Sequence, residues 1–332
     1  MSAERYVIDH ELVREHGFEP YEGTPLDVRA VIAGLPQNVK DGFRFDAVPW
    51  GRFGHAYGPG DNIPGLLAQV RSSNAEVVHA ALRELWASIV HQGTVGSVAP
   101  LTIPFLLRAA SDPTAHHRAN TLNLASAAAR REHWGSGTRE TFLQVTRQEW
   151  MYDCGGYAMN WSIEASRSAI AADTDLLLPL LHAADPDIRT ATCYALATAS
   201  CEAGRITDAL RARLATEPSP TVRASIVLAV AELAREHNDP RAVTWSRTLW
   251  PDPTQLADVR VSAALAWLCL VDDPVPNDLR TTLDTLSTAE LTRLLNDVPW
   301  IANVDDENGL ARTLDQMLDK AQPGAIDSNP WD

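Results

Sequence analysis

Apolar residues recur at intervals of three and four along most of the chain. In the stretch "SPTVRASIVLAVAELA" the positions Val222, Ile226, Val230 and Leu233 follow this spacing. On a helix with 3.6 residues per turn they form one apolar stripe, which predicts a helix packed against a neighbour. Every other periodic segment has the same spacing, and alternation of apolar and polar residues at period two is missing. The pattern therefore predicts an all-α protein without an extended sheet.

The helical segments repeat. "DPDIRTATCYALA" from Asp185 and "SPTVRASIVLAVA" from Ser219 align Arg189 with Arg223, and "ADVRVSAALAWL" places Arg260 in register. Asp and Ser are favoured helix N-caps, and a proline follows each at the first helical position, where its missing N–H costs nothing. One helix pair cannot bury both of its apolar faces, so the repeat predicts an α-solenoid of stacked pairs. We expect each repeated arginine to bond to acidic groups or carbonyls of the next unit.

The unit, a helix pair with D-P-x-[IV]-R at its second helix, resembles the HEAT-like repeats of bacterial proteins over roughly residues 60–270. A longer stretch, "HAYGPGDNIPGLL" followed by "HQGTVGSVAPLTIPFLL", looks like the N-terminal half of a group of actinobacterial HEAT-repeat proteins. The resemblance implies an architecture of stacked helix pairs. The likeness to the actinobacterial group implies no particular activity.

Two segments break the repeat. Residues 131–160 contain "GSG" and "CGG" and are expected to be an insertion, while the irregular residues 1–58 are expected to form an N-terminal cap. The predicted organisation is therefore this cap, a solenoid over 59–320 and a flexible tail over 321–332. Because insertions in repeat proteins map to loops on one face, often the binding face, the insertion is a candidate binding surface.

The insertion holds the densest group of aromatic side chains. Tyr and Trp anchor many binding surfaces, but packing of a bulky insertion would explain the same residues, and both interpretations remain open. The candidate binding residues in this group are Trp150, Tyr152, Asp153, Tyr157 and Trp161.

A second candidate is the polar joint "HQGTVGS" at residues 91–97. Helix capping would explain it, with Gly93 as a left-handed residue that ends one helix and Ser97 as the start of the next. Alternatively, a neighbouring loop converges on this corner to bind a polar group. The residues of that second interpretation are His55, Tyr57, His91, Gln92 and Thr94.

Charge narrows the choice of partner. The formal net charge is −15, and the last 82 residues carry 15 Asp and Glu against five Lys and Arg. A basic or neutral partner is expected, and nucleic acid is not, because phosphate binding needs clustered Arg or Lys. No apolar run approaches the ~20 residues that cross a bilayer, and the charged start has no secretory h-region, so no membrane association and a cytoplasmic location are expected.

The four cysteines are far apart and show no metal-ligand spacing. We therefore expect no metal and no cofactor, and reduced cysteines in the core. Cys154, between "MYD" and "GGY", is the exception whose role the pattern does not indicate.

Three hypotheses of function follow. The first is a non-catalytic scaffold that binds a protein or peptide, in a regulatory, assembly or immunity-type role. The second is an enzyme whose pocket lies between the insertion and the 91–97 corner, with His91 or Asp153 as acid or base and Tyr152 as hydrogen-bond donor. The third is a helical-repeat DNA glycosylase. It is implied only because some DNA glycosylases are built from similar HEAT-like repeats, and the acidic net charge of this chain argues against it.

Overall fold

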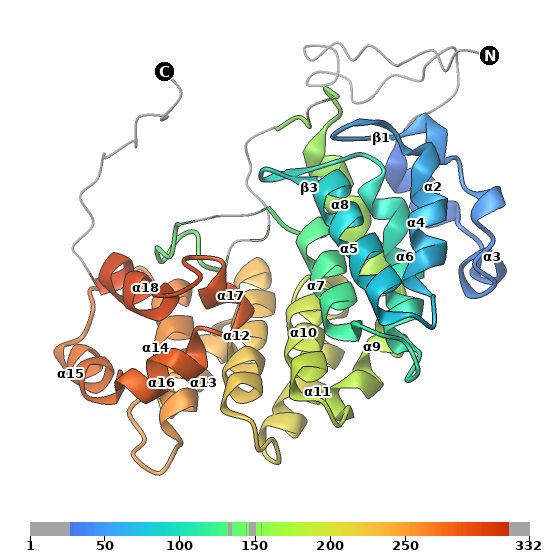
Figure 1. Cartoon of the computed structure of the whole chain (residues 1–332). Helices are drawn as coiled ribbons and strands as arrows, with labels where there is room; N and C mark the ends of the chain where they lie inside the picture. The colour runs from blue at the N-terminus through green and yellow to red at the C-terminus, as the bar shows by residue number, and fades with distance from the viewer. Residues whose placement is uncertain (1–26, 132–134, 144, 146–150, 154, 319–332) are drawn as a thin grey trace.

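The computed structural model describes residues 27–131, 135–143, 145, 151–153 and 155–318. These ranges are mostly helical, which confirms the predicted class (Figure 1). The structure also contains two small antiparallel hairpins that the pattern did not predict. One pairs β1 (Gly54–His55) with β2 (Gly58–Pro59), and the other pairs β3 (Val90–His91) with β4 (Thr94–Val95).

The helices of the N-terminal half are α2 (Val28–Gly34), α3 (Gln37–Asp41), α4 (Ile63–Val70), α5 (Ala75–Ile89), α6 (Ala99–Ser111), α7 (Arg118–Ala128), α8 (Met159–Ala172), α9 (Thr174–Leu177) and α10 (Pro186–Leu196). Those of the C-terminal half are α11 (Ala203–Leu214), α12 (Pro220–His237), α13 (Pro240–Leu249), α14 (Ala257–Leu270), α15 (Asn277–Leu286), α16 (Ala289–Leu295), α17 (Pro299–Ala302) and α18 (Gly309–Leu318). Short 3₁₀ turns lie at Phe45–Ala47, Trp50–Arg52, Gly60–Asn62, Leu178–His182 and Ser200–Glu202.

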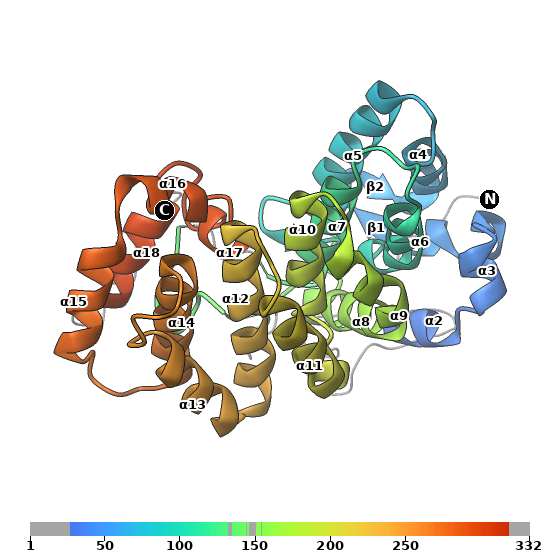
Figure 2. The same cartoon turned by 90° about the horizontal axis from the view of Figure 1, so that it is seen from below.

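Four helices, α7, α10, α12 and α14, lie side by side in chain order (Figures 1 and 2). The second layer is formed by α11 against α12 and α13 against α14. Ile188, Val222 and Val259 are all buried in this row, which confirms the register predicted from the repeat. In α12 every residue from 222 to 234 is buried, a wider surface than the predicted stripe, because α10 and α14 cover it on both sides.

Two of the three repeated arginines make the expected bonds to the next unit. Arg189 donates to two carbonyls of the turn before its own helix and to both carboxylate oxygens of Glu217, at 2.9 and 2.8 Å. Arg223 does the same one unit later, with the carboxylate of Asp258 at 2.7 and 2.9 Å. Among the described residues Arg260 donates only to a carbonyl that precedes its own helix, that of Trp250, so the prediction was wrong for Arg260. Arg189 and Arg223 thus tie the loop of one unit to an acid of the next.

The predicted caps are confirmed in part. The Asp185 side chain accepts the N–H of Asp187 at 2.9 Å, and Pro186 and Pro220 open their helices as expected. Ser219 stands at the N-cap position, but its side chain makes no capping bond.

In the N-terminal half, α6 is buried along almost its whole length among α2, α3, α4, α7, α8 and α9. The described part of the expected cap, residues 27–58, packs α2 on α6 and α8 and packs α3 on α6. Residues 1–26 and the expected tail 321–332 lie outside the described residues, as does Cys154. Cys193 and Cys269 are buried as predicted, whereas Cys201 is exposed and the prediction for it was wrong.

In the described part of the chain, no helix combines the length and the apolar composition that crossing a bilayer requires.

Candidate functional site

The joint "HQGTVGS" is a β-hairpin, so its interpretation as a capped helix end was wrong. Helix α5 ends at Ile89, and strands β3 and β4 follow with His91 paired to Thr94. Gln92 and Gly93, at the turn, have φ of 47° and 77°. Two consecutive residues with positive φ are what a two-residue hairpin loop requires, since that turn matches the twist of its strands. Gly93 is left-handed as expected, but in this turn and not at a helix end.

The structure brings the predicted His55–Tyr57 loop to this corner. The Gly54 carbonyl accepts the Val98 N–H at 3.0 Å, and the Ala56 N–H donates to the Ser88 carbonyl at 3.1 Å. The ring of Tyr57 lies edge-on to that of His91, with 5.4 Å between centroids. At 67% exposure, Tyr57 is the most exposed of the large apolar side chains in the described part of the chain.

Polar groups at the corner bond mainly to one another. His55 Nδ1 accepts the Tyr57 N–H at 3.1 Å, and its Nε2 lies 2.9 Å from Asn62 Oδ1. His91 Nδ1 donates to the Ala87 carbonyl at 3.1 Å, and the Thr94 hydroxyl donates to the His91 carbonyl at 2.7 Å. These bonds hold the two hairpins in a defined geometry.

Asp153 joins the insertion to the corner. Its Oδ2 accepts the Ser97 N–H at 3.1 Å, and its Oδ1 accepts the N–H groups of Gly155 and Tyr157, each at 2.9 Å. Burial raises the pKa of the Asp153 carboxyl, an effect that the N–H donors partly offset. The carboxylate therefore fastens the 151–158 loop to the 91–97 corner.

The aromatic candidates that the structure describes in and next to the insertion are mostly core. Tyr157 is fully buried, accepts the Val28 N–H on its hydroxyl at 2.9 Å and packs edge-on to Trp161, 6.1 Å away. Trp161 is buried too, with the Arg29 guanidinium 4.2 Å from its ring. Tyr157 and Trp161 were predicted as binding residues, but their burial leaves no surface for a partner. Tyr152 is half-buried against the core, and Trp150 lies outside the described residues.

Replacing Asp153 by Asn should loosen this junction. An amide keeps one acceptor oxygen, so it cannot receive both the Ser97 N–H and the pair of N–H groups on Oδ1. A buried N–H without an acceptor costs about 1–3 kcal/mol. We expect faster hydrogen exchange at Ser97 and a lower melting temperature. Exchange of the α14 amides should become faster only as far as the loss of global stability requires. Unaltered exchange at Ser97 would show that the carboxylate does not hold the loop.

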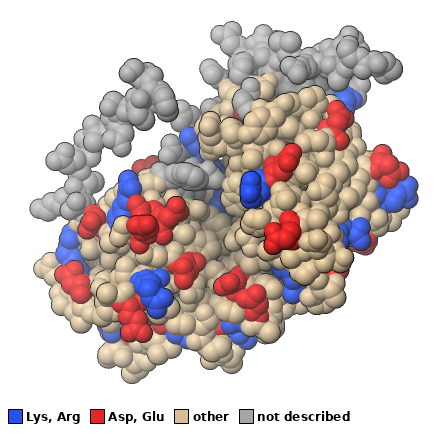
Figure 3. Space-filling view, viewed as in Figure 1, with Lys and Arg blue, Asp and Glu red and all other residues tan. Residues whose placement is uncertain are grey.

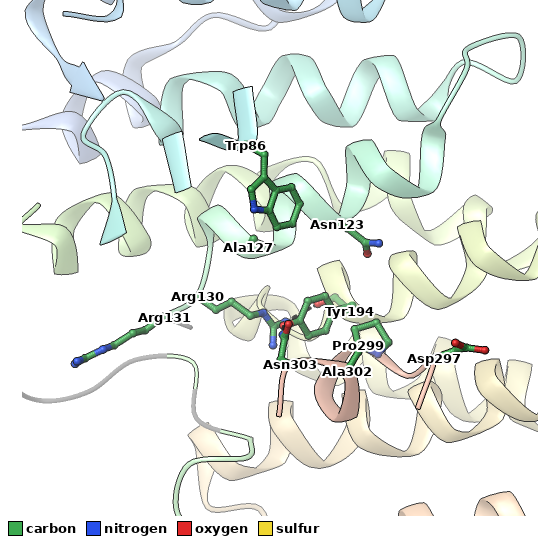
Figure 4. Close-up of a pocket in the computed structure, with 10 residues that line it drawn as sticks. All are labelled: Trp86, Asn123, Ala127, Arg130, Arg131, Tyr194, Asp297, Pro299, Ala302 and Asn303. Atoms are coloured by element: carbon green, nitrogen blue, oxygen red, sulfur yellow. Dashed lines mark hydrogen bonds between the residues drawn. The ribbon is translucent and has the colours of Figure 1, made fainter. Parts of the chain in front are cut away.

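A pocket that sequence reasoning missed lies between the two halves, with α5 and α7 on one side and α17 on the other (Figure 4). Its volume is about 200 Å³. Trp86 reaches into it from α5 and remains 38% exposed. The lining residues are Trp86, Asn123, Ala127, Arg130, Arg131, Tyr194, Asp297, Pro299, Ala302 and Asn303.

Arg130 organises the floor of this pocket. Its guanidinium donates to Glu232 Oε2 at 2.9 Å and to the Tyr194 carbonyl at 2.6 Å, and it lies 3.6 Å over the Tyr194 ring. The Trp300 indole N–H donates to the same Glu232 oxygen, and its ring packs edge-on to Tyr194 at 4.8 Å. The Asn303 amide donates to the Tyr194 hydroxyl at 2.7 Å. Residues from α10, α12 and α17 thus meet around one arginine.

Hydrogen-bonding capacity remains in this region. Arg130 Nε, Glu232 Oε1 and Asn123 Oδ1 are buried atoms without a hydrogen-bond partner. Glu232 is completely buried, which raises its pKa because Arg130 and the Trp300 indole offset the loss of hydration only in part. Buried polar atoms without partners are uncommon in native proteins and call for an explanation.

One signal in the sequence could have indicated this region. Glu232 interrupts "IVLAVAELA", an otherwise apolar helix, and an acid there needs a cationic partner. Its partner, Arg130, is 102 residues away and outside the periodic part of the repeat, so spacing alone could not identify it.

The chain was compared with known proteins. No family model matches it, and no curated protein matches it. Among the described residues, no group of three or more His, Cys, Asp or Glu is placed to hold a metal ion.

Proposed function

We propose that the chain is a non-catalytic α-solenoid of HEAT-like helix pairs that binds a segment of a partner protein or peptide in the pocket between α5, α7 and α17. The observation that carries this proposal is the half-exposed Trp86 beside the amides of Asn123 and Asn303. A Trp offers a large, stiff contact area, and carboxamides can both donate to and accept from a peptide main chain. Such a combination suits an extended segment with one apolar anchor.

Charge supports a basic or neutral partner. The net charge of −15 attracts cationic segments and repels phosphate backbones. On the face seen in Figure 3, acidic and basic side chains are interspersed, and no broad basic area appears. This favours a protein partner over nucleic acid.

The corner supports a structural role better than the enzyme hypothesis. Asp153, a candidate acid or base with His91 and Tyr152, directs both carboxylate oxygens to backbone N–H groups. A carboxylate bonded in this way holds a loop in place, and its oxygens are not directed at a substrate.

The proposal is tested by selecting short random peptides on the purified protein and measuring their affinity for two variants. Trp86→Ala should weaken binding about 30-fold, which corresponds to ~2 kcal/mol for a lost anchor. Tyr57→Ala is the matched control, because it removes another exposed aromatic side chain outside the pocket lining. If Tyr57→Ala abolishes binding while Trp86→Ala does not, the binding site is at the 91–97 corner.

A further inference from the structure

The pocket presents a specific set of unused groups. Arg130 is 4% exposed, lines the pocket and has an Nε–H without a partner, so it offers a charge-assisted donor. Asn123 offers Oδ1, an acceptor without a partner. The apolar surfaces of Trp86, Pro299 and Ala302 line the same pocket. A fitting ligand therefore combines an anionic acceptor, an N–H donor and an apolar group.

Size limits that ligand. A volume of about 200 Å³ is smaller than the ~300–1,000 Å³ of pockets that enclose drug-sized ligands. It suits a single residue whose chain leaves through the open side. The ligand is then one residue that carries all three groups within a few bonds.

We infer that the pocket takes the C-terminal residue of the partner chain, an inference that rests on the proposed binding function. The α-carboxylate lies at Arg130, the last main-chain N–H donates to Asn123 Oδ1, and the apolar side chain packs on Trp86. An internal Asp or Glu also supplies a carboxylate. Its side chain is then used to reach Arg130, so that residue has no apolar side chain to pack on Trp86. Capture of a terminal carboxylate is a known mode of peptide recognition.

The charges at the two ends of the pocket suggest a direction for the peptide. In Figure 4, Arg131 lies at one end and Asp297 at the other, with Arg130 between them on the side of Arg131. A carboxylate is favoured at Arg130 and a cationic residue near Asp297. The peptide then runs with its terminus toward Arg131, and the residues before the terminus favour Lys or Arg.

Two libraries of short random peptides test the inference. In one, each peptide is fused through its N-terminus and ends in a free carboxylate; in the other, each is fused through its C-terminus. Enrichment of the first library alone supports the inference, and enrichment of neither overturns the proposed binding function itself. Equal enrichment of both libraries overturns the inference but leaves the proposed binding function standing. The same conclusion follows if the second library yields peptides that all carry Asp or Glu.

A selected peptide is then synthesised as the free acid, the C-terminal amide and the form N-methylated at its last amide. Titration calorimetry should show at least about tenfold weaker binding of the amide to the wild-type protein. Asn123→Ala should weaken binding of the free-acid peptide by roughly threefold. In that variant, N-methylation of the peptide should cause no further loss of affinity. Asn123 Oδ1 has no partner to lose, so the variant is expected to fold, which its melting curve checks. Equal affinities of acid and amide would overturn the assignment.

Discussion

Replacing Val222 by Asp is expected to unfold the central part of the protein. Val222 is completely buried on α12, between α10 and α14. An aspartate there would be a buried charge without a partner, and the cost of several kcal/mol approaches the ~5–15 kcal/mol that stabilises a typical domain. Circular dichroism should show loss of helical signal at temperatures where the wild-type protein is folded.

The matched control is Ala212→Asp on α11, in the same repeat. Ala212 is exposed, so the new charge stays hydrated. The loss of stability should then come only from the lower helix propensity of Asp and stay below about 1 kcal/mol. Similar melting curves for the two variants would mean that the face of α12 carrying Val222 is not the packed one.

Replacing Arg130 by Met should cost about 3–5 kcal/mol of unfolding free energy. The reason is that the completely buried Glu232 would lose the only cationic partner that it has among the described residues. The Tyr194 carbonyl would also lose a donor. Urea denaturation measures the loss. The control is Arg241→Met, which removes a mostly exposed arginine paired with Asp239 and should change stability by less than about 1 kcal/mol.

A double variant separates the charge from the packing. In Arg130→Met with Glu232→Leu neither charge of this pair remains, so most of the lost stability should return. The single variant should also respond to pH. Without Arg130 the pKa of Glu232 rises further above its ordinary 4.5, and since a raised native pKa stabilises only the protonated state, stability should fall as pH increases from about 4.5 through the native value. A single variant whose stability is flat with pH would contradict this account of Glu232.

The candidate site shows how far sequence reasoning reaches. It identified His55, Tyr57 and His91 as a group, and the structure places their rings together. It did not predict that Gln92 and Gly93 would turn a hairpin, because helix capping and a two-residue hairpin loop favour similar residues. For Tyr157 and Trp161 it left burial open, since aromatic composition is the same in a core and in a binding surface.

The sequence by itself determined the helical class, the register of the repeat and the arginine bonds between units. Each depends on spacing within one or two neighbouring units: the stripe through Val222, the proline-opened helices, and Arg189 and Arg223 at matched positions. Only the tertiary structure decided which distant residues meet. The Arg130–Glu232 pair and the Trp86 pocket arise where α5 and α7 face α17, and their positions depend on how helices far apart in the chain pack together. Packing of many side chains sets that arrangement, and no local period in the sequence encodes it.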